Sequence, residues 1–173
     1  MGTTFVVALL AACAALLLGV APLRAQVPTG HPDHDHDHDE PLHALALNEL
    51  DFGTVFPGIP ASVSASDPHH AGLFQVTGPK GASVRVEFVL PGALAAGGAL
   101  LPLAFGPRDG YADFSRGRPP RGLSFDPHAP VIGSLGPNGS LYLRLGGTAL
   151  PERTQPGGEY RATIFMTVYD VGN

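Results

Sequence analysis

The side chains in this sequence best suited to chemistry are histidines and aspartates that alternate in one short tract. Imidazole and carboxylate groups together suit Zn²⁺, Ni²⁺ or Cu²⁺. The candidate metal ligands are His31, His34, Asp35, His36, Asp37, His38 and Asp39. Structural zinc sites hold their ligands at set spacings within a fold, and a tract of this kind does not. Two interpretations therefore stay open: weak metal capture by the tract, and a solvated anionic spacer.

Catalytic motifs are missing from the sequence. It contains no Gly-x-Ser-x-Gly elbow, no His-Glu-x-x-His pair and, after Cys13, no cysteine nucleophile. Two Asp-Pro-His triplets, at residues 67–69 and 126–128, would form a metal site only if the fold brought them together. Asp-Pro is a pair that favours the start of a turn. We therefore expect two loop turns, no catalytic residues and no required cofactor.

Four of the ten basic residues gather in the middle of the chain. They are Arg108, Arg116, Arg118 and Arg121. A cluster of this kind could dock an anionic polysaccharide, a lipid head group or the acidic tail of the protein itself. The alternative, which we favour, is a solvated loop, because arginines are mostly exposed in any protein.

The compartment in which these groups would act is indicated by residues 1–25, which have the pattern of a secretory signal peptide. An uncharged apolar run from Phe5 to Val20 is followed by small residues and a proline up to Ala25. The run is shorter than the roughly 20 residues of a membrane-spanning helix. We expect cleavage after Ala25, export to the periplasm or cell surface, and no transmembrane segment in the mature chain. A competing interpretation is a lipobox ending at Cys13, which would be lipidated.

Composition and charge narrow the role of the remaining chain. A net charge of −5 argues against general nucleic-acid binding. Cys13 is the only cysteine, so the mature chain can form no intrachain disulfide and must be held by packing. Residues 26–41 are rich in histidine and acid and poor in apolar side chains, which predicts a disordered tail. Residues 42–173 are long enough for one domain.

From residue 42 onward apolar side chains recur at every second position, which is typical of β-strands. Strands are expected at residues 72–77, 83–90 and 100–105, and the Asn138-Gly139 pair predicts a hairpin. The expected inner faces are Leu45, Leu47 and Phe52 in the first strand, Val84, Val86, Phe88 and Leu90 in a middle strand, and Tyr160, Ala162, Ile164, Met166 and Val168 in a last strand over residues 159–171. No amphipathic helix is apparent. The sequence predicts an all-β, immunoglobulin-like antiparallel sandwich of about seven to nine strands.

Three blocks of this region, in order, resemble the bacterial secreted domain of unknown function 4402. They read LDFGTVFPG at residues 50–58, LFQVTGPKGASVRVEFVLP at 73–91 and LRLGGTALPERTQPGGEYRATIFMTVY at 143–169. The positions that fall in step with the family are Gly146, Gly147, Pro151, Pro156, Gly157 and Tyr160. The His/Asp tail and the basic stretch at residues 108–121 depart from the family pattern.

The resemblance implies a pilin-like or spore-coat-like sandwich of the cell envelope with no known catalytic residues. We therefore expect an exported, non-enzymatic envelope or surface protein with a structural or adhesive role. Such domains can assemble by strand addition, and residues 42–47 are a possible donor to another copy or to another envelope protein. The alternative is that these residues pair within their own sheet. The alternative function is a periplasmic metal-binding protein that acts through its His/Asp tail.

Overall fold

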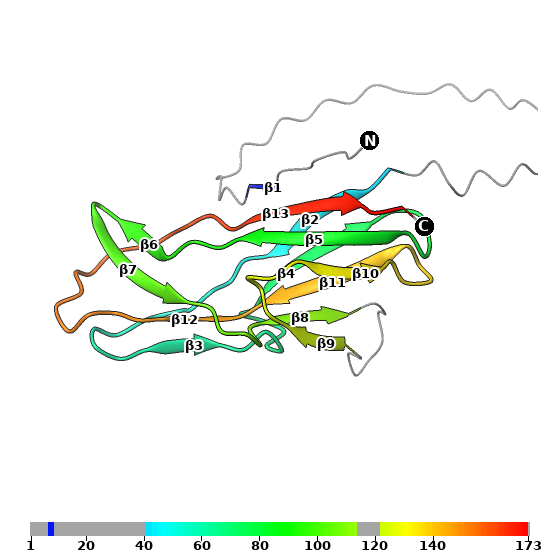
Figure 1. Ribbon diagram of the computed structural model, residues 1–173. Helices are drawn as coiled ribbons and strands as arrows, with labels where there is room; N and C mark the ends of the chain where they lie inside the picture. Colours follow the sequence, from blue (N-terminus) through cyan, green and yellow to red (C-terminus); the bar gives the residue numbers. More distant parts are fainter. Residues whose placement is uncertain (1–6, 9–40, 114–121, 173) are drawn as a thin grey trace, which may run out of the picture.

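A computed structural model of the protein describes residues 7–8, 41–113 and 122–172 (Figure 1). The predicted metal ligands between His31 and Asp39, the lipidation candidate Cys13, and the arginines 116, 118 and 121 lie outside these residues. Arg108 is described and is exposed to solvent.

Every regular element of the described chain is a β-strand, and every pairing is antiparallel. The strands are β1 (Val7–Ala8), β2 (His43–Asn48), β3 (Ala61–Val63), β4 (Gly72–Thr77), β5 (Ser83–Val89), β6 (Ala93–Ala96), β7 (Ala99–Ala104), β8 (Gly110–Asp113), β9 (Gly122–Phe125), β10 (Val131–Ser134), β11 (Ser140–Leu145), β12 (Gly147–Ala149) and β13 (Phe165–Asp170). The predicted sandwich is confirmed. Its strands are more numerous and shorter than expected, because Gly-Gly and Pro-Gly pairs divide the middle of the chain.

Two sheets form the body of the sandwich and a third extends it (Figure 1). The first sheet has the order β1-β13-β5-β10, and the second has the order β2-β4-β11-β8-β9. The third, smaller sheet has the order β3-β12-β7-β6. In the sequence the third sheet is inserted mainly between strands of the first two, and it lies toward one end of the molecule.

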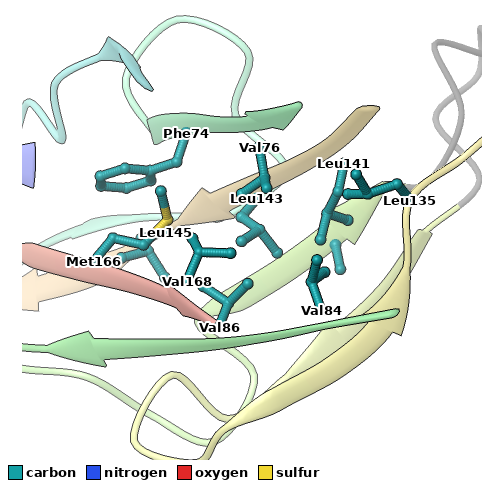
Figure 2. Packing of buried hydrophobic residues seen from close by; sticks show 11 residues of the cluster. Phe74, Val76, Val84, Val86, Leu135, Leu141, Leu143, Leu145, Met166 and Val168 are labelled. Carbon is teal, nitrogen blue, oxygen red and sulfur yellow. The ribbon is translucent and has the colours of Figure 1, made fainter. Parts of the chain in front are cut away.

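The core lies between the first two sheets and is made by strict alternation (Figure 2). From β5, Val84 and Val86 are fully buried while Arg85 points to solvent, as the sequence predicts. The fully buried leucines of β11 face them from the second sheet. β13 completes the core with Met166 and Val168. Complete removal of these side chains from water is the main stabilising term of the fold.

The predicted inner face of the first strand is wrong by one residue. Leu45 and Leu47 are 54% and 49% exposed, whereas Ala44 and Ala46 pack toward the core. The register explains the shift, because Ala44 and Ala46 lie opposite the large inward residues Val76 and Phe74 of β4. A one-residue shift moves every side chain to the other face. Phe52 lies beyond the end of β2 at Asn48.

The last strand is shorter than predicted. β13 begins at Phe165, and of residues 159–164 only Arg161 makes a ladder contact, an isolated bridge to Ala95 of β6. Phe165 pairs with Val89, the last residue of β5, after which the chain reaches Pro91. Residues before Phe165 therefore have no partner in β5, and they run on as an extended segment without a strand beside them in the first sheet.

The Asn138-Gly139 pair forms a turn but not the predicted hairpin. Gly139 has a φ of 65°, and its amide donates to the carbonyl of Gly136 at 2.8 Å. The strand before the turn, β10, pairs with β5, and the strand after it, β11, pairs with β4 and β8. The turn therefore carries the chain from one sheet of the sandwich to the other.

Candidate binding site

A groove with a volume of about 940 Å³ opens beside β13, where the chain leaves the regular sandwich. Its two long walls are residues 48–55, which follow β2, and residues 155–164, which precede β13. Both walls are extended segments that lack a continuous strand partner. The volume lies in the range of about 300 to 1,000 Å³ that is usual for ligand sites.

The floor of the groove is apolar. Phe74 and Leu101 are almost fully buried beneath it, and Leu94, Leu103 and Ile164 are half-buried along it. Phe74 also belongs to the main core, where its ring meets the ring of Phe88 edge-on at a centroid distance of 5.4 Å. The groove is therefore a place where the core itself comes near solvent, and covering it would remove more apolar surface from water.

The first wall is fixed by hydrogen bonds to the turn before β4. The side-chain amide of Asn48 donates to the carbonyl oxygens of His69 at 3.1 Å and Ala71 at 3.0 Å. The backbone amide of Asp51 donates to the carbonyl of His70 at 2.9 Å. Asp51 in turn accepts a bond from the amide of Gly53, which adopts a φ of 61° that favours glycine. These bonds hold the first wall against the turn before β4.

The second wall is fixed to β6 and β7. The amide group of Gln155 donates to the carbonyl of Leu100 at 3.1 Å and to the hydroxyl of Tyr160 at 2.7 Å. The Tyr160 hydroxyl donates to the carbonyl of Pro156 at 2.7 Å, which closes the loop. Arg161 and Ala95 exchange backbone hydrogen bonds of 2.9 and 3.0 Å. Both walls of the groove are thus held by the protein without any ligand.

The rim of the groove carries charge but no recognisable catalytic set. Glu49 and Asp51 are exposed on the first wall, and Glu159 forms an ion pair with Arg161 on the second. Among the described residues, no three His, Cys, Asp or Glu side chains are grouped so that they could hold a metal ion. The apolar floor and the two extended walls have the shape to receive an extended segment with apolar side chains.

The two Asp-Pro-His triplets form separate turns, as the sequence predicts. Asp67 accepts backbone hydrogen bonds from His69 at 2.8 Å and His70 at 3.1 Å, and these bonds hold the pKa of its carboxyl below the ordinary value. Asp126 accepts one from His128 at 2.9 Å, which lowers the pKa of that carboxyl in the same way. Each aspartate also contacts the imidazole of its own turn. The hydrogen bonds shape the turns and leave the two triplets in separate places.

Sequence reasoning did not find the groove. The signals that could have indicated it are the Pro and Gly residues in and beside the two walls, at Pro57, Pro151 and residues 156–158. A proline cannot donate to a ladder, so strands end near these positions. The part of the chain that the structure describes contains no helix that could cross a membrane. No protein-family model, curated protein sequence or solved structure matches this chain.

Proposed function

We propose that this is an exported, non-enzymatic protein of the cell envelope or surface with a structural or adhesive, pilin-like role. The observation that supports the proposal is the apolar groove beside β13, whose walls are two extended segments of the protein's own backbone. Strand addition to an open sheet edge is a common way for proteins to recognise extended peptides. The resemblance to the bacterial secreted domain family and the signal-like residues 1–25 support export.

The shape of the groove supports a peptide ligand. An extended segment rises about 3.3 Å per residue, so eight residues of either wall span roughly 26 Å. A strand lying between the walls could pair with backbone on either side and bury alternate side chains against Leu94, Leu101 and Leu103. Backbone pairing gives affinity, and alternate side-chain pockets give selectivity.

The predicted donor segment has a place in its own sheet. Residues 42–47 lie almost entirely in β2, which pairs with β4 along its length. Donating this segment to another molecule would require β2 to leave that sheet and uncover Val76 and Phe74. In our proposal the domain therefore acts as the acceptor of a strand.

Export is tested by cell fractionation with N-terminal sequencing of the mature protein. We expect the protein in the periplasm or on the surface with Gln26 as its first residue. A full-length protein found in the cytoplasm would contradict the proposal.

The role of the groove is tested by Leu94→Glu, which puts a charge on its floor. The matched control is Leu123→Glu on β9, where the native side chain is already 71% exposed. Surface assembly should fail with the first variant and persist with the second, with both folded.

A second candidate function rests on the alternating His/Asp tract at residues 31–39, which would make this a periplasmic Zn²⁺, Ni²⁺ or Cu²⁺ binding protein. A peptide of residues 30–40 should then bind Zn²⁺ near neutral pH and release it at about pH 5, because protonated imidazole no longer binds metal. Deleting residues 31–40 should abolish zinc affinity without loss of fold. Calorimetry that shows no heat at high micromolar zinc would remove this candidate.

A further inference from the structure

The third sheet, at one end of the molecule (Figure 1), has apolar side chains on both of its faces. Residues 93–104, which include β6 and β7, read ALAAGGALLPLA and contain no charged or hydrogen-bonding side chain. On the inner face Leu101 is almost fully buried, and Leu103 is half-buried on the floor of the groove. Continuous apolar runs of this kind are typical of sheets that are covered on both faces. The sequence of this sheet therefore indicates that its outer face also has a partner.

The outer face of the third sheet is exposed in the described chain. β7 presents Leu100, Pro102 and Ala104 to solvent, and Leu100 is 64% exposed. Leu150 follows the buried Ala149 of β12, so it points to the outer face, where it is 40% exposed. Its backbone amide donates to the carbonyl of Pro102 at 2.9 Å. These side chains therefore form an apolar surface over the middle of the sheet.

The polar side chains of this face bond to each other. Ser62 of β3 lies opposite Thr148 of β12, and their hydroxyl oxygens share a hydrogen bond of 2.9 Å. A hydroxyl that keeps a hydrogen-bond partner costs less to remove from water than one that loses it. The four strands of the third sheet contain no charged residue. The face could therefore be buried without leaving a polar side chain unpaired.

The other two sheets have polar outer faces. On the first sheet, Arg85 and Glu87 of β5 form an ion pair. On the second, Arg144 of β11 lies between Leu73 of β4 and Tyr111 of β8. Monomeric proteins seldom expose large apolar patches, and such a patch marks an interaction site. Of the three described sheets, the third has the outer face best suited to burial against another molecule.

The remaining segments of this chain do not match the outer face of the third sheet. Residues 26–40 join the domain at β2 of the second sheet and carry five acidic side chains. Residues 114–121 connect β8 and β9 of the same sheet and carry three arginines. Burying such charges against an apolar face is costly. Residues 1–25 are apolar, but we expect them to be removed on export. The partner of the face is therefore a separate molecule.

We propose that the outer face of the third sheet is a dimer interface, in which the same face of a second copy packs on Leu100, Pro102 and Leu150. A twofold dimer brings the same patch of each subunit together, so the patch must complement itself. An apolar sheet face without charges meets this condition. Two sheets packed face to face lie about 10 Å apart. The inference goes beyond the proposed function, because this face lies on the other side of β7 from the groove floor.

The size of the face predicts a weak dimer. Four strands about 4.8 Å apart, with outward residues about 6.8 Å apart along β7, give a face of roughly 400 Å² once the side chains at its border are included. The turn before β3 adds Phe56 and Ile59 at the edge, which are 63% and 60% exposed. Interfaces that bury less than about 1,200 Å² in total are characteristic of transient complexes. We therefore expect a dissociation constant of about 10 to 100 μM.

The interface is tested by sedimentation velocity over about 1 to 500 μM protein, purified with the N-terminus that it has in the cell. The variant is Leu100→Glu, and its matched control is Leu45→Glu on the outer face of the second sheet, where the native side chain is 54% exposed. Both positions are exposed, so folding should persist in each variant. Leu100→Glu should raise the dissociation constant at least about tenfold, because the dimer would bury a carboxylate without a partner. Leu45→Glu should change it by less than about twofold, since exposed surface substitutions have small effects.

Three results of this measurement would overturn the inference. They are a parent protein that stays monomeric throughout the range, an equal loss of association in both variants, and an unchanged dimer in Leu100→Glu. A monomeric parent that instead binds vesicles of phosphatidylethanolamine and phosphatidylglycerol, with binding lost in Leu100→Glu, would assign the face to a lipid surface and also overturn the dimer. Cytoplasmic location would contradict the proposed function and leave a measured dimer standing.

Cross-linking decides the question if Leu100→Glu does not fold. Leu100→Cys and its control Leu45→Cys are each made in the Cys13→Ser chain, which has no other thiol. A bismaleimide should join two copies of Leu100→Cys into a covalent dimer, because the same face of each copy meets across the interface. It should leave Leu45→Cys monomeric. Equal cross-linking of the two variants, or none in Leu100→Cys, would overturn the interface.

Discussion

The two ends of this sandwich bury the same kinds of apolar side chain to different extents. In β5 and β11, valine and leucine at alternate positions are fully buried and belong to one packed cluster between the sheets (Figure 2). Beside residues 155–164 the side chains that continue this core, such as Leu103 and Ile164, are only half-buried and line a groove of about 940 Å³. Packed side chains fill one end of the sandwich, whereas the other end keeps an open groove.

The two ends differ in burial because Pro and Gly residues interrupt the alternation of apolar and polar side chains at the open end. β5 and β11 contain neither Pro nor Gly and pair with neighbours along their full lengths. The second wall of the groove contains Pro156 and two consecutive glycines, and the backbones of both walls are anchored mainly by side-chain hydrogen bonds. The open end is therefore held by local polar contacts, whereas the closed end is held by apolar burial.

The largest contrast should come from truncating a leucine at each end. Leu143→Ala empties a fully buried position and should reduce the free energy of unfolding by about 2 to 5 kcal/mol. Leu103→Ala, on the half-buried floor of the groove, should cost less than about 1.5 kcal/mol, because part of that side chain already meets water. Urea unfolding measures both values, and equal losses would show that the two ends are packed alike.

A smaller contrast is expected from adding one methyl group to Gly146, which follows β11, and to Gly157 in the second wall. A Cβ on Gly146 would lie 2.3 Å from the carbonyl oxygen of Val63, so Gly146→Ala should destabilise the protein by about 1 to 3 kcal/mol. A Cβ on Gly157, in the second wall, would meet nothing within 4 Å. Gly157→Ala should change the free energy of unfolding by no more than about 1 kcal/mol. We expect an increase, because alanine restricts the unfolded chain more than glycine does. Thermal unfolding would show whether the order is reversed.

The hydrogen bonds of the second wall should have a modest effect that is local to the groove. Tyr160→Phe removes the hydroxyl that joins Pro156 to Gln155 and should cost about 0.5 to 1.5 kcal/mol. Amides of residues 155–161 should exchange faster with solvent, and those of β11 should not change. Loss of protection throughout the molecule would mean that the wall is part of the cooperative core.

The smallest effect concerns pH and lies in the turn that anchors the first wall. Backbone hydrogen bonds from His69 and His70 lower the pKa of Asp67. Its stabilising contribution is therefore present above the ordinary aspartate pKa and lost as the pH falls through the lower, folded-state pKa. An NMR titration of the Asp67 carboxyl carbon should give a midpoint below the ordinary value. A midpoint at or above that value would show that the turn does not form as described.

The closed end of the molecule could be predicted from sequence, and the open end could not. Alternation in β5 gave its buried face correctly, because polar residues mark the outer side. In β2 both faces are largely apolar, so alternation alone could not show whether Ala44 or Leu45 faces the core. The inward face is decided by the large residues of β4 that lie opposite. The length of β13 depends on where its partner β5 ends. The groove forms where residues 48–55 and residues 155–164 come together, and no local sequence pattern predicts a meeting of segments so far apart in the chain.

The central claim, that one end of the sandwich is a closed core while the other end is open at the groove, is tested most directly by hydrogen exchange. We predict that the amides of Leu141, Leu143 and Leu145 exchange only when the whole domain unfolds, whereas those of residues 155–161 exchange through local opening. Equal protection of the two regions would contradict the account.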